Sequence, residues 1–154
     1  MKRIIATLLA FAATAATAQS PKSVDVFSAD QIKHQFAQAL LQANQKGSGG
    51  SVLADYGNHD MRVSTRTANG GAEVHAHFAD VFYVASGYAT LITGGTVVDP
   101  TTKANGETLG KSIQNGVSRK LGPGDFVHIP AGVPHQLLIP KGNVFNYLVV
   151  KVHE

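Results

Sequence analysis

The sequence predicts an all-β domain of the jelly-roll kind, preceded by one amphipathic helix. Three observations lead to this prediction. Short β-capable runs follow one another closely from Ser51 to Val152, turns that bear Gly, Asn or Pro separate them, and a single helical pattern comes before them. Many short strands with frequent turns are typical of β-sandwiches and β-barrels.

The helical pattern begins at Ser28-Ala29-Asp30-Gln31, where a hydroxyl precedes a Gln by three residues, as in a capping box. Apolar residues then recur at helical spacing, at Ile32, Phe36, Ala39, Leu40 and Ala43. Gly47 and the small residues after it end the pattern. We therefore expect a helix of about four turns that packs its apolar face on the strands.

Nine runs rich in β-branched and aromatic residues are predicted as strands: residues 51–56, 61–67, 72–77, 81–85, 89–93, 117–121, 126–129, 136–139 and 145–152. The segment from Asp99 to Gly116 is instead polar and rich in Thr, Asn and Gly. We expect a long loop or an irregular hairpin there, which is either the lid of a site or a surface insertion.

The N-terminus has the three parts of a secretory signal peptide. Lys2 and Arg3 precede an uncharged run that closes with Ala16-Thr17-Ala18. The run is shorter than the about 20 apolar residues that a membrane span requires. We predict cleavage after Ala18 and a periplasmic or secreted protein with no membrane segment after cleavage.

Three regions follow from these patterns: a signal peptide at residues 1–18, an N-terminal arm and helix at residues 19–50, and the β domain at residues 51–154. Within the arm, Pro21 to Phe27 is expected to be a mobile lead-in or an added edge strand. An edge strand there could pair with a second copy and form a homodimer.

Charge and cysteine content narrow the functional classes. Cleavage removes two of the 13 basic residues and leaves 11 against 10 acidic ones, so the mature chain gives no argument for nucleic-acid binding. The sequence has no cysteine, which excludes disulfides and thiolate metal sites. Any metal would be held by His and carboxylate ligands, which suit Mn, Fe, Ni, Cu or Zn.

Five residues of ligand type fall where strand alternation directs them together. Glu73, His75 and His77 follow a period of two and project to one face of a predicted strand, and Asp80 opens the next run. His135 follows a turn that two prolines stiffen. These residues predict a His/carboxylate metal site in the interior. Alternatively, the His pair is a solvated strand face and Asp80 a turn former.

Other polar residues are candidates for supporting roles. Glu73, Tyr83 and Tyr88 are possible acid/base groups near a metal, although packing alone would also explain the two phenols. Arg62 and Arg66 share one face of their strand. They would neutralise a carboxylate substrate if that face is interior, and would be solvated if it is not.

The chain resembles the cupin family. The residues Gly124-(five residues)-Pro130-x-Gly132-(two residues)-His135 match the second cupin motif except for the usual Asn after the His. Asp80-(six residues)-Gly87 matches the second half of the first motif, with Asp in place of Glu. The H-x-H of the first motif falls either on Glu73 and His75 or on His75 and His77. Both registers keep His75, Asp80 and His135.

The resemblance implies a double-stranded β-helix (the jelly-roll barrel of cupins), a divalent metal in its interior and frequent dimers. The chain most resembles small exported single-domain cupins, and the sequences of residues 79–84, 94–100 and 128–138 carry this resemblance. Cupins include dioxygenases, decarboxylases, isomerases, lyases and pure binding proteins, so the fold implies no single reaction.

We therefore expect an exported metal-binding cupin that acts on or binds a small oxygen-rich molecule, either a carboxylate or a sugar acid. The metal ligands would be His75, Asp80 and His135 with Glu73 or His77. The alternative is a non-catalytic module that binds a small ligand without metal.

Overall fold

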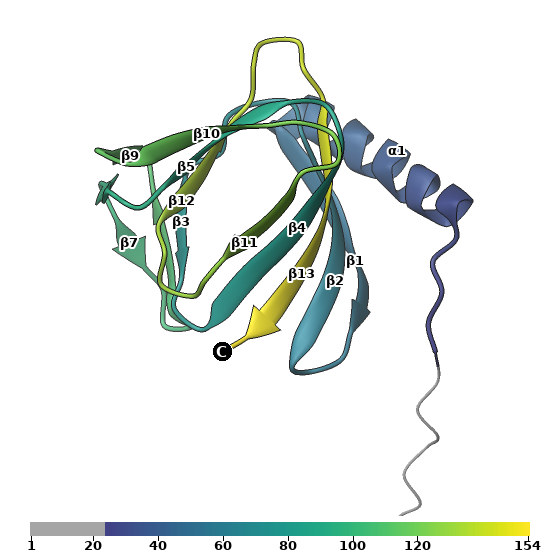
Figure 1. The fold of residues 1–154 in the computed structure, drawn as a ribbon, viewed down its shortest axis with the longest axis horizontal. Coiled ribbons are helices and arrows are strands. Elements are labelled where there is room, and N and C mark those ends of the chain that lie inside the picture. The colour runs from purple at the N-terminus through teal and green to yellow at the C-terminus, as the bar shows by residue number, and fades with distance from the viewer. Residues whose placement is uncertain (1–23) are drawn as a thin grey trace, which may run out of the picture.

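The computed structural model describes residues 24–154, so the predicted signal peptide and its cleavage site lie outside the described residues. The described part contains one helix and thirteen strands (Figure 1). That helix, α1, lacks the length and the apolar character of a membrane-spanning helix.

The elements have the following bounds: α1 (Ala29–Lys46), β1 (Ser48–Asp55), β2 (His59–Arg66), β3 (Ala72–His75), β4 (Phe78–Ser86), β5 (Ala89–Thr93), β6 (Thr96–Val98), β7 (Thr101–Thr102), β8 (Glu107–Gly110), β9 (Ser112–Gln114), β10 (Val117–Leu121), β11 (Phe126–Ile129), β12 (His135–Leu138) and β13 (Phe145–His153).

Two antiparallel sheets build the domain. One sheet has the strand order β1-β2-β13-β4-β11, the other has the order β10-β5-β12-β3-β8-β7, and β6 pairs with β9 in a small separate ribbon. The two large sheets face each other, and α1 lies outside β1 and β2 (Figure 1). The predicted all-β class with one N-terminal helix is confirmed.

The apolar core fills the space between the two sheets. Both sheets contribute to it, because alternate residues of each strand point inward. Its buried members are Phe82, Val84, Ala89, Leu91, Leu121, Ile129, Leu137, Ile139, Phe145, Tyr147 and Val149.

The helix forms as the sequence predicts. The Ser28 hydroxyl accepts a hydrogen bond from the Gln31 backbone N–H, and the Gln31 side chain accepts one from the Ser28 N–H, which completes the capping box. Ala39 and Ala43 are buried against the sheet. Gly47 ends the helix in the left-handed conformation, with its N–H bonded to the Ala43 carbonyl.

The structure differs from the sequence prediction at several strand boundaries and in the polar segment before β10. The strand predicted at residues 72–77 ends at His75, and Ala76 and His77 form a bend before β4 begins at Phe78. Residues 99–116 contain β7, β8 and β9, so of the two expectations the irregular hairpin is closer. Residues 24–28 form no strand, and β1 begins already at Ser48.

Two motif glycines differ in what surrounds them. Gly87 has φ 79° and Gly124 has φ 92°, so each occupies the left-handed region. A methyl group at Gly87 would collide with the Val144 carbonyl oxygen, whereas a methyl group at Gly124 would meet open space. The Gly87 turn therefore carries a steric constraint in addition to the backbone one.

We predict that Gly124→Ala lowers the free energy of unfolding by about 1 kcal/mol, from backbone strain alone. Gly87→Ala should lower the free energy of unfolding by clearly more than Gly124→Ala does, because the clash with Val144 adds to the same backbone strain. Urea denaturation of both variants measures the difference. Equal losses would show that the close approach at Gly87 has no energetic weight.

Candidate metal centre

Three cross-strand pairs bring the polar residues of the interior together. In each pair the two residues lie directly opposite one another on neighbouring antiparallel strands: Glu73 of β3 and His135 of β12, His75 of β3 and Glu107 of β8, and Asp80 of β4 and Lys151 of β13. Opposite residues of an antiparallel pair are close enough for their side chains to interact. The strand register therefore assembles the site.

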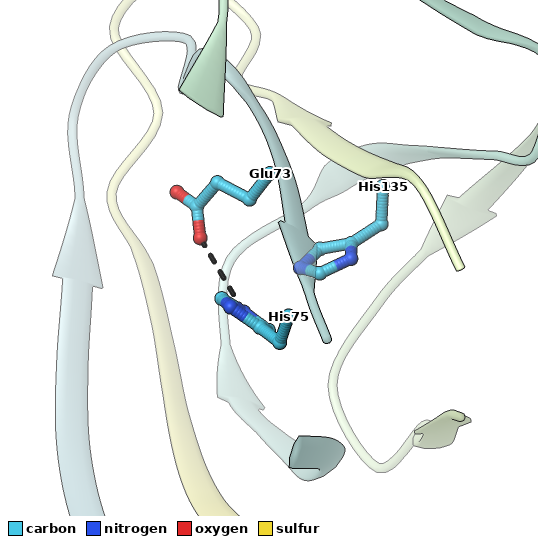
Figure 2. A group of neighbouring side chains, drawn as sticks. All are labelled: Glu73, His75 and His135. Carbon is cyan, nitrogen blue, oxygen red and sulfur yellow. Dashed lines mark ion pairs between the residues drawn. The ribbon is translucent and has the colours of Figure 1, made fainter. Parts of the chain in front are cut away.

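Glu73, His75 and His135 form a group whose potential ligand atoms all lie within 4.8 Å of one another. Figure 2 shows the Glu73 carboxylate directed at the His75 ring, with the His135 ring beside it. The two imidazole centroids are 5.0 Å apart. Asp80 joins from β4, with its Oδ2 3.3 Å from His75 Nε2 and 3.7 Å from His135 Nε2.

The hydrogen bonds of both imidazoles leave Nε2 directed at this group. His75 Nδ1 lies 2.8 and 2.7 Å from the two carboxylate oxygens of Glu107, and His135 Nδ1 lies 3.0 Å from the Val133 carbonyl oxygen. These partners accept, so each Nδ1 donates. A metal-binding His has this arrangement, in which an acceptor behind one nitrogen orients the other toward the ion.

The turn before His135 is tied to the end of β3. The Gly132 N–H donates to the His75 carbonyl at 2.8 Å, and the Gly94 N–H donates to the Pro134 carbonyl at 2.9 Å. Two backbone hydrogen bonds therefore fix the turn relative to β3 and β5. This connection explains how His75 and His135, far apart along the chain, keep a defined separation.

The carboxylates of Glu73 and Asp80 divide their oxygens in the same way: one oxygen contacts a cationic side chain, and the other is directed at an imidazole. Glu73 Oε1 accepts from Arg66 at 3.2 Å, while Oε2 lies 3.8 Å from His75 Nε2. Asp80 Oδ1 accepts from Lys151 Nζ at 2.6 Å, while Oδ2 faces both imidazoles. One oxygen of each carboxylate is thus directed at the centre of the group.

The local charges shift the pKa values of the buried groups. Burial alone would raise the pKa of Asp80, but His75 and Lys151 outweigh it and lower that pKa to about 2. Burial lowers the pKa of His135. Burial also opposes a charged His75, yet contact with Asp80 and Glu107 raises its pKa overall. At any pH at which His75 is protonated, a metal would have to displace a proton from its imidazole in order to bind.

The residues present fit a divalent transition metal. His75 Nε2 is buried and makes no hydrogen bond. Burying a polar atom without a partner costs free energy, so such an atom in a protein usually has one. An ion bound between this nitrogen, His135 Nε2 and Glu73 Oε2 would supply that partner. Imidazole with carboxylate is a ligand set that Mn, Fe, Ni, Cu and Zn accept, and Glu73, His75 and His135 could hold any of them.

Two sets of predicted site residues lie away from this centre. His77 is exposed and stacks on His153 instead, with ring centroids 6.3 Å apart, because β3 ends before it and its alternation stops. The structure therefore does not bring His77 to the group that Glu73, His75 and His135 form. The acid/base candidates Tyr83 and Tyr88 are 44% and 61% exposed, and the structure does not bring them to the centre either. Tyr83 alternates with inward-facing Phe82 and therefore points outward.

A cavity of about 160 Å³ opens beside the centre, and Glu73, Asp80 and His135 form part of its wall. Arg62, Arg66, Lys151 and Tyr147 also line it, so the face shared by the two arginines is interior. Arg66 Nε donates to the Tyr147 hydroxyl at 3.3 Å. The phenol of the site is therefore Tyr147 and comes from β13.

Sequence reasoning missed Glu107 and Lys151. Glu107 lies in the segment interpreted as a loop or irregular hairpin, and only the β3–β8 register reveals its contact with His75. Lys151 did carry a signal, since it continues the inward alternation of Phe145, Tyr147 and Val149 along the last strand. That alternation could have placed it in the interior.

Comparisons with solved structures identify the fold. The polyketide cyclase RemF from Streptomyces resistomycificus matches with a TM-score of 0.50 and 19% identity over 71% of this chain and 67% of its own. KdgF from a Halomonas species matches with a TM-score of 0.51 and 14% identity over 70% and 82%. An uncharacterised protein with a double-stranded β-helix domain from Klebsiella pneumoniae matches with a TM-score of 0.51 and 19% identity over 69% and 76%.

These likenesses establish the fold and nothing finer, because every identity is low. The chain has the cupin double-stranded β-helix, as the sequence predicts. No family model matches the sequence, and no curated protein matches it either.

We predict that the double variant His75→Ala/His135→Ala loses bound transition metal, because both imidazole ligands are removed. His77→Ala should retain the metal content of the wild type, since His77 lies outside the centre. Elemental analysis of untagged protein after metal loading measures both. Loss of metal from His77→Ala with retention in the double variant would place the ion elsewhere.

We predict that Glu107→Gln weakens metal binding by about 10- to 100-fold, because it removes the charged acceptor that orients His75 and raises its basicity. Titration calorimetry with Zn²⁺ measures the change. Glu154→Gln is the matched control, since Glu154 is exposed and, within the described residues, its side chain accepts a hydrogen bond only from the Ala131 N–H. An equal effect in both variants would contradict the role of Glu107.

Proposed function

We propose that this chain is an exported metal-binding cupin that acts on or binds a small oxygen-rich anion, either a carboxylate or a sugar acid. The ion would be held by Glu73, His75 and His135, with Asp80 as a fourth candidate ligand. The observation that carries the proposal is the buried His75 Nε2, which has no hydrogen bond and faces two carboxylates and a second imidazole.

The charge of the cavity supports an anionic ligand. Its wall contains the cations Arg62, Arg66 and Lys151 and the carboxylates Glu73 and Asp80, and Arg62 is paired with Asp60 next to the wall, so these charges balance before an ion binds. A divalent ion would add two further positive charges to this small space. An incoming carboxylate would offset that excess, whereas a neutral or cationic ligand would not.

The cavity offers a proton-transfer group next to the ligand position. The Tyr147 hydroxyl faces the cavity and accepts a hydrogen bond from Arg66, which would stabilise the oxygen after it has given up its proton. When bound, a divalent ion would polarise a carbonyl or carboxyl oxygen of the ligand. Isomerase, lyase and decarboxylase reactions need these two functions, and iron at the same position would extend the range to dioxygen chemistry.

A second candidate function is a binding module that works without metal. One observation favours it: both carboxylates of the centre already have a cationic partner, Arg66 for Glu73 and Lys151 for Asp80. In that case the cavity would hold an anion through N–H groups of Arg62, Arg66 and Lys151 that do not contact Asp60, Glu73 or Asp80. Export from the cell and dimer formation stay predictions for either function.

Ligand titrations separate the two candidates. We predict that metal-loaded protein binds short hydroxy acids and sugar acids, that the corresponding neutral alcohols do not bind, and that a chelator abolishes binding. At saturating metal, Arg66→Met should weaken acid binding by about tenfold or more, because a charge-assisted contact is lost. Arg119→Met is the control, since Arg119 is exposed and lies outside this cavity.

Binding that survives the chelator unchanged would favour the metal-free module. Equal binding of acids and alcohols would contradict an anion site of either kind. Turnover is followed in the same samples by proton NMR of each bound acid.

A further inference from the structure

The ammonium group of Lys151 contacts the same carboxylate that faces the candidate metal position. Lys151 lies opposite Asp80 across β13 and β4, and its Nζ is 2.6 Å from Asp80 Oδ1. The two side chains are only 13% and 12% exposed. Such a pair is desolvated, and its partners therefore interact strongly.

The two oxygens of Asp80 serve different neighbours. Oδ1 contacts the ammonium, and Oδ2 lies near Nε2 of both His75 and His135. A divalent ion between the imidazoles would therefore share Asp80 with a buried positive charge. Two cations on one carboxylate repel each other and divide its negative charge, which disfavours the metal-bound form.

We propose that Lys151 is an internal counter-cation that competes with the metal for Asp80 and so sets the metal affinity of the centre. The inference rests on the proposed metal site and goes beyond it, because Lys151 is a positioning residue that acts through Asp80 and not a ligand. In the metal-free protein Lys151 neutralises Asp80. Metal binding requires that this ion pair be weakened.

The structure contains a matched pair for comparison. Lys111 and Asp99 also form an ion pair, with Nζ 2.7 Å from Oδ2, but their side chains are 79% and 62% exposed. Solvent screens the charges of such an exposed pair, so removing it changes the free energy of unfolding little. Lys111→Met therefore makes the same chemical change as Lys151→Met in a place where competition with the metal is absent.

The test measures Zn²⁺ affinity by competition with a chromophoric chelator. All proteins carry His77→Ala, so that the exposed imidazoles of His77 and His153 do not contribute. We expect Lys151→Met to bind Zn²⁺ at least about tenfold more tightly than its parent, because the competing charge is gone and the metal now neutralises Asp80. Lys111→Met should match the parent, and Asp80→Asn should bind more weakly.

The outcomes distinguish failure of the inference from failure of the proposed function. Parent protein that binds Zn²⁺, with Lys151→Met no tighter, overturns the competition but keeps the metal site. Asp80→Asn that binds as tightly as the parent overturns it too, since Asp80 would then not touch the ion. Absence of binding in both the parent and Lys151→Met overturns the metal site itself.

A second measurement on the unsubstituted chain covers the case in which Lys151→Met does not fold. The side-chain ammonium of each lysine is observed by ¹⁵N NMR while Zn²⁺ is added. The Lys151 signal should shift with the same midpoint as metal binding, and the Lys111 signal should stay in place. A Lys151 signal that does not respond to bound Zn²⁺ would overturn the inference.

Discussion

Asp80 and Lys151 face each other across β4 and β13, and the arrangement of the interior depends on this register. A slip of one residue between these strands would turn the inward side chains of one strand outward. Asp80 would then leave the imidazoles, and the buried ammonium would lose its partner. The same condition holds for β3, whose pairing with β12 and β8 places Glu73 opposite His135 and His75 opposite Glu107.

The fold accommodates this polar group because the interior is divided along the strands. On β4 the inward residues change from Asp80 to Phe82 and Val84, and on β13 the inward residues change from Lys151 to Val149 and Phe145. Charged groups thus collect at one end of the space between the sheets, and the apolar core fills the other. Each described charge at the polar end has an opposite charge nearby, which offsets the cost of desolvation.

Metal affinity and ligand charge are linked in such a centre. Glu73 and Asp80 each divide their two oxygens between a cation and the imidazoles. Whatever binds between the imidazoles therefore competes with Arg66 and Lys151, and an anion entering the cavity would find these cations close by. The ion pairs of the interior are consequently part of the site, in addition to their structural role.

Local pattern in the sequence determined the helix, most of the strands and three of the central residues. Capping chemistry and helical spacing identified α1, and the glycine, proline and histidine spacing of the motifs placed His75, Asp80 and His135 together. Tertiary structure alone brought Glu73, and not His77, beside His75 and His135, because β3 ends at His75 and His77 lies in the bend that follows it. It also recruited Glu107 and turned Tyr83 outward while Tyr147 faces the cavity. Alternation gives the face of a residue only when the ends and the register of its strand are known, and those are set by hydrogen bonds to segments far away in the chain.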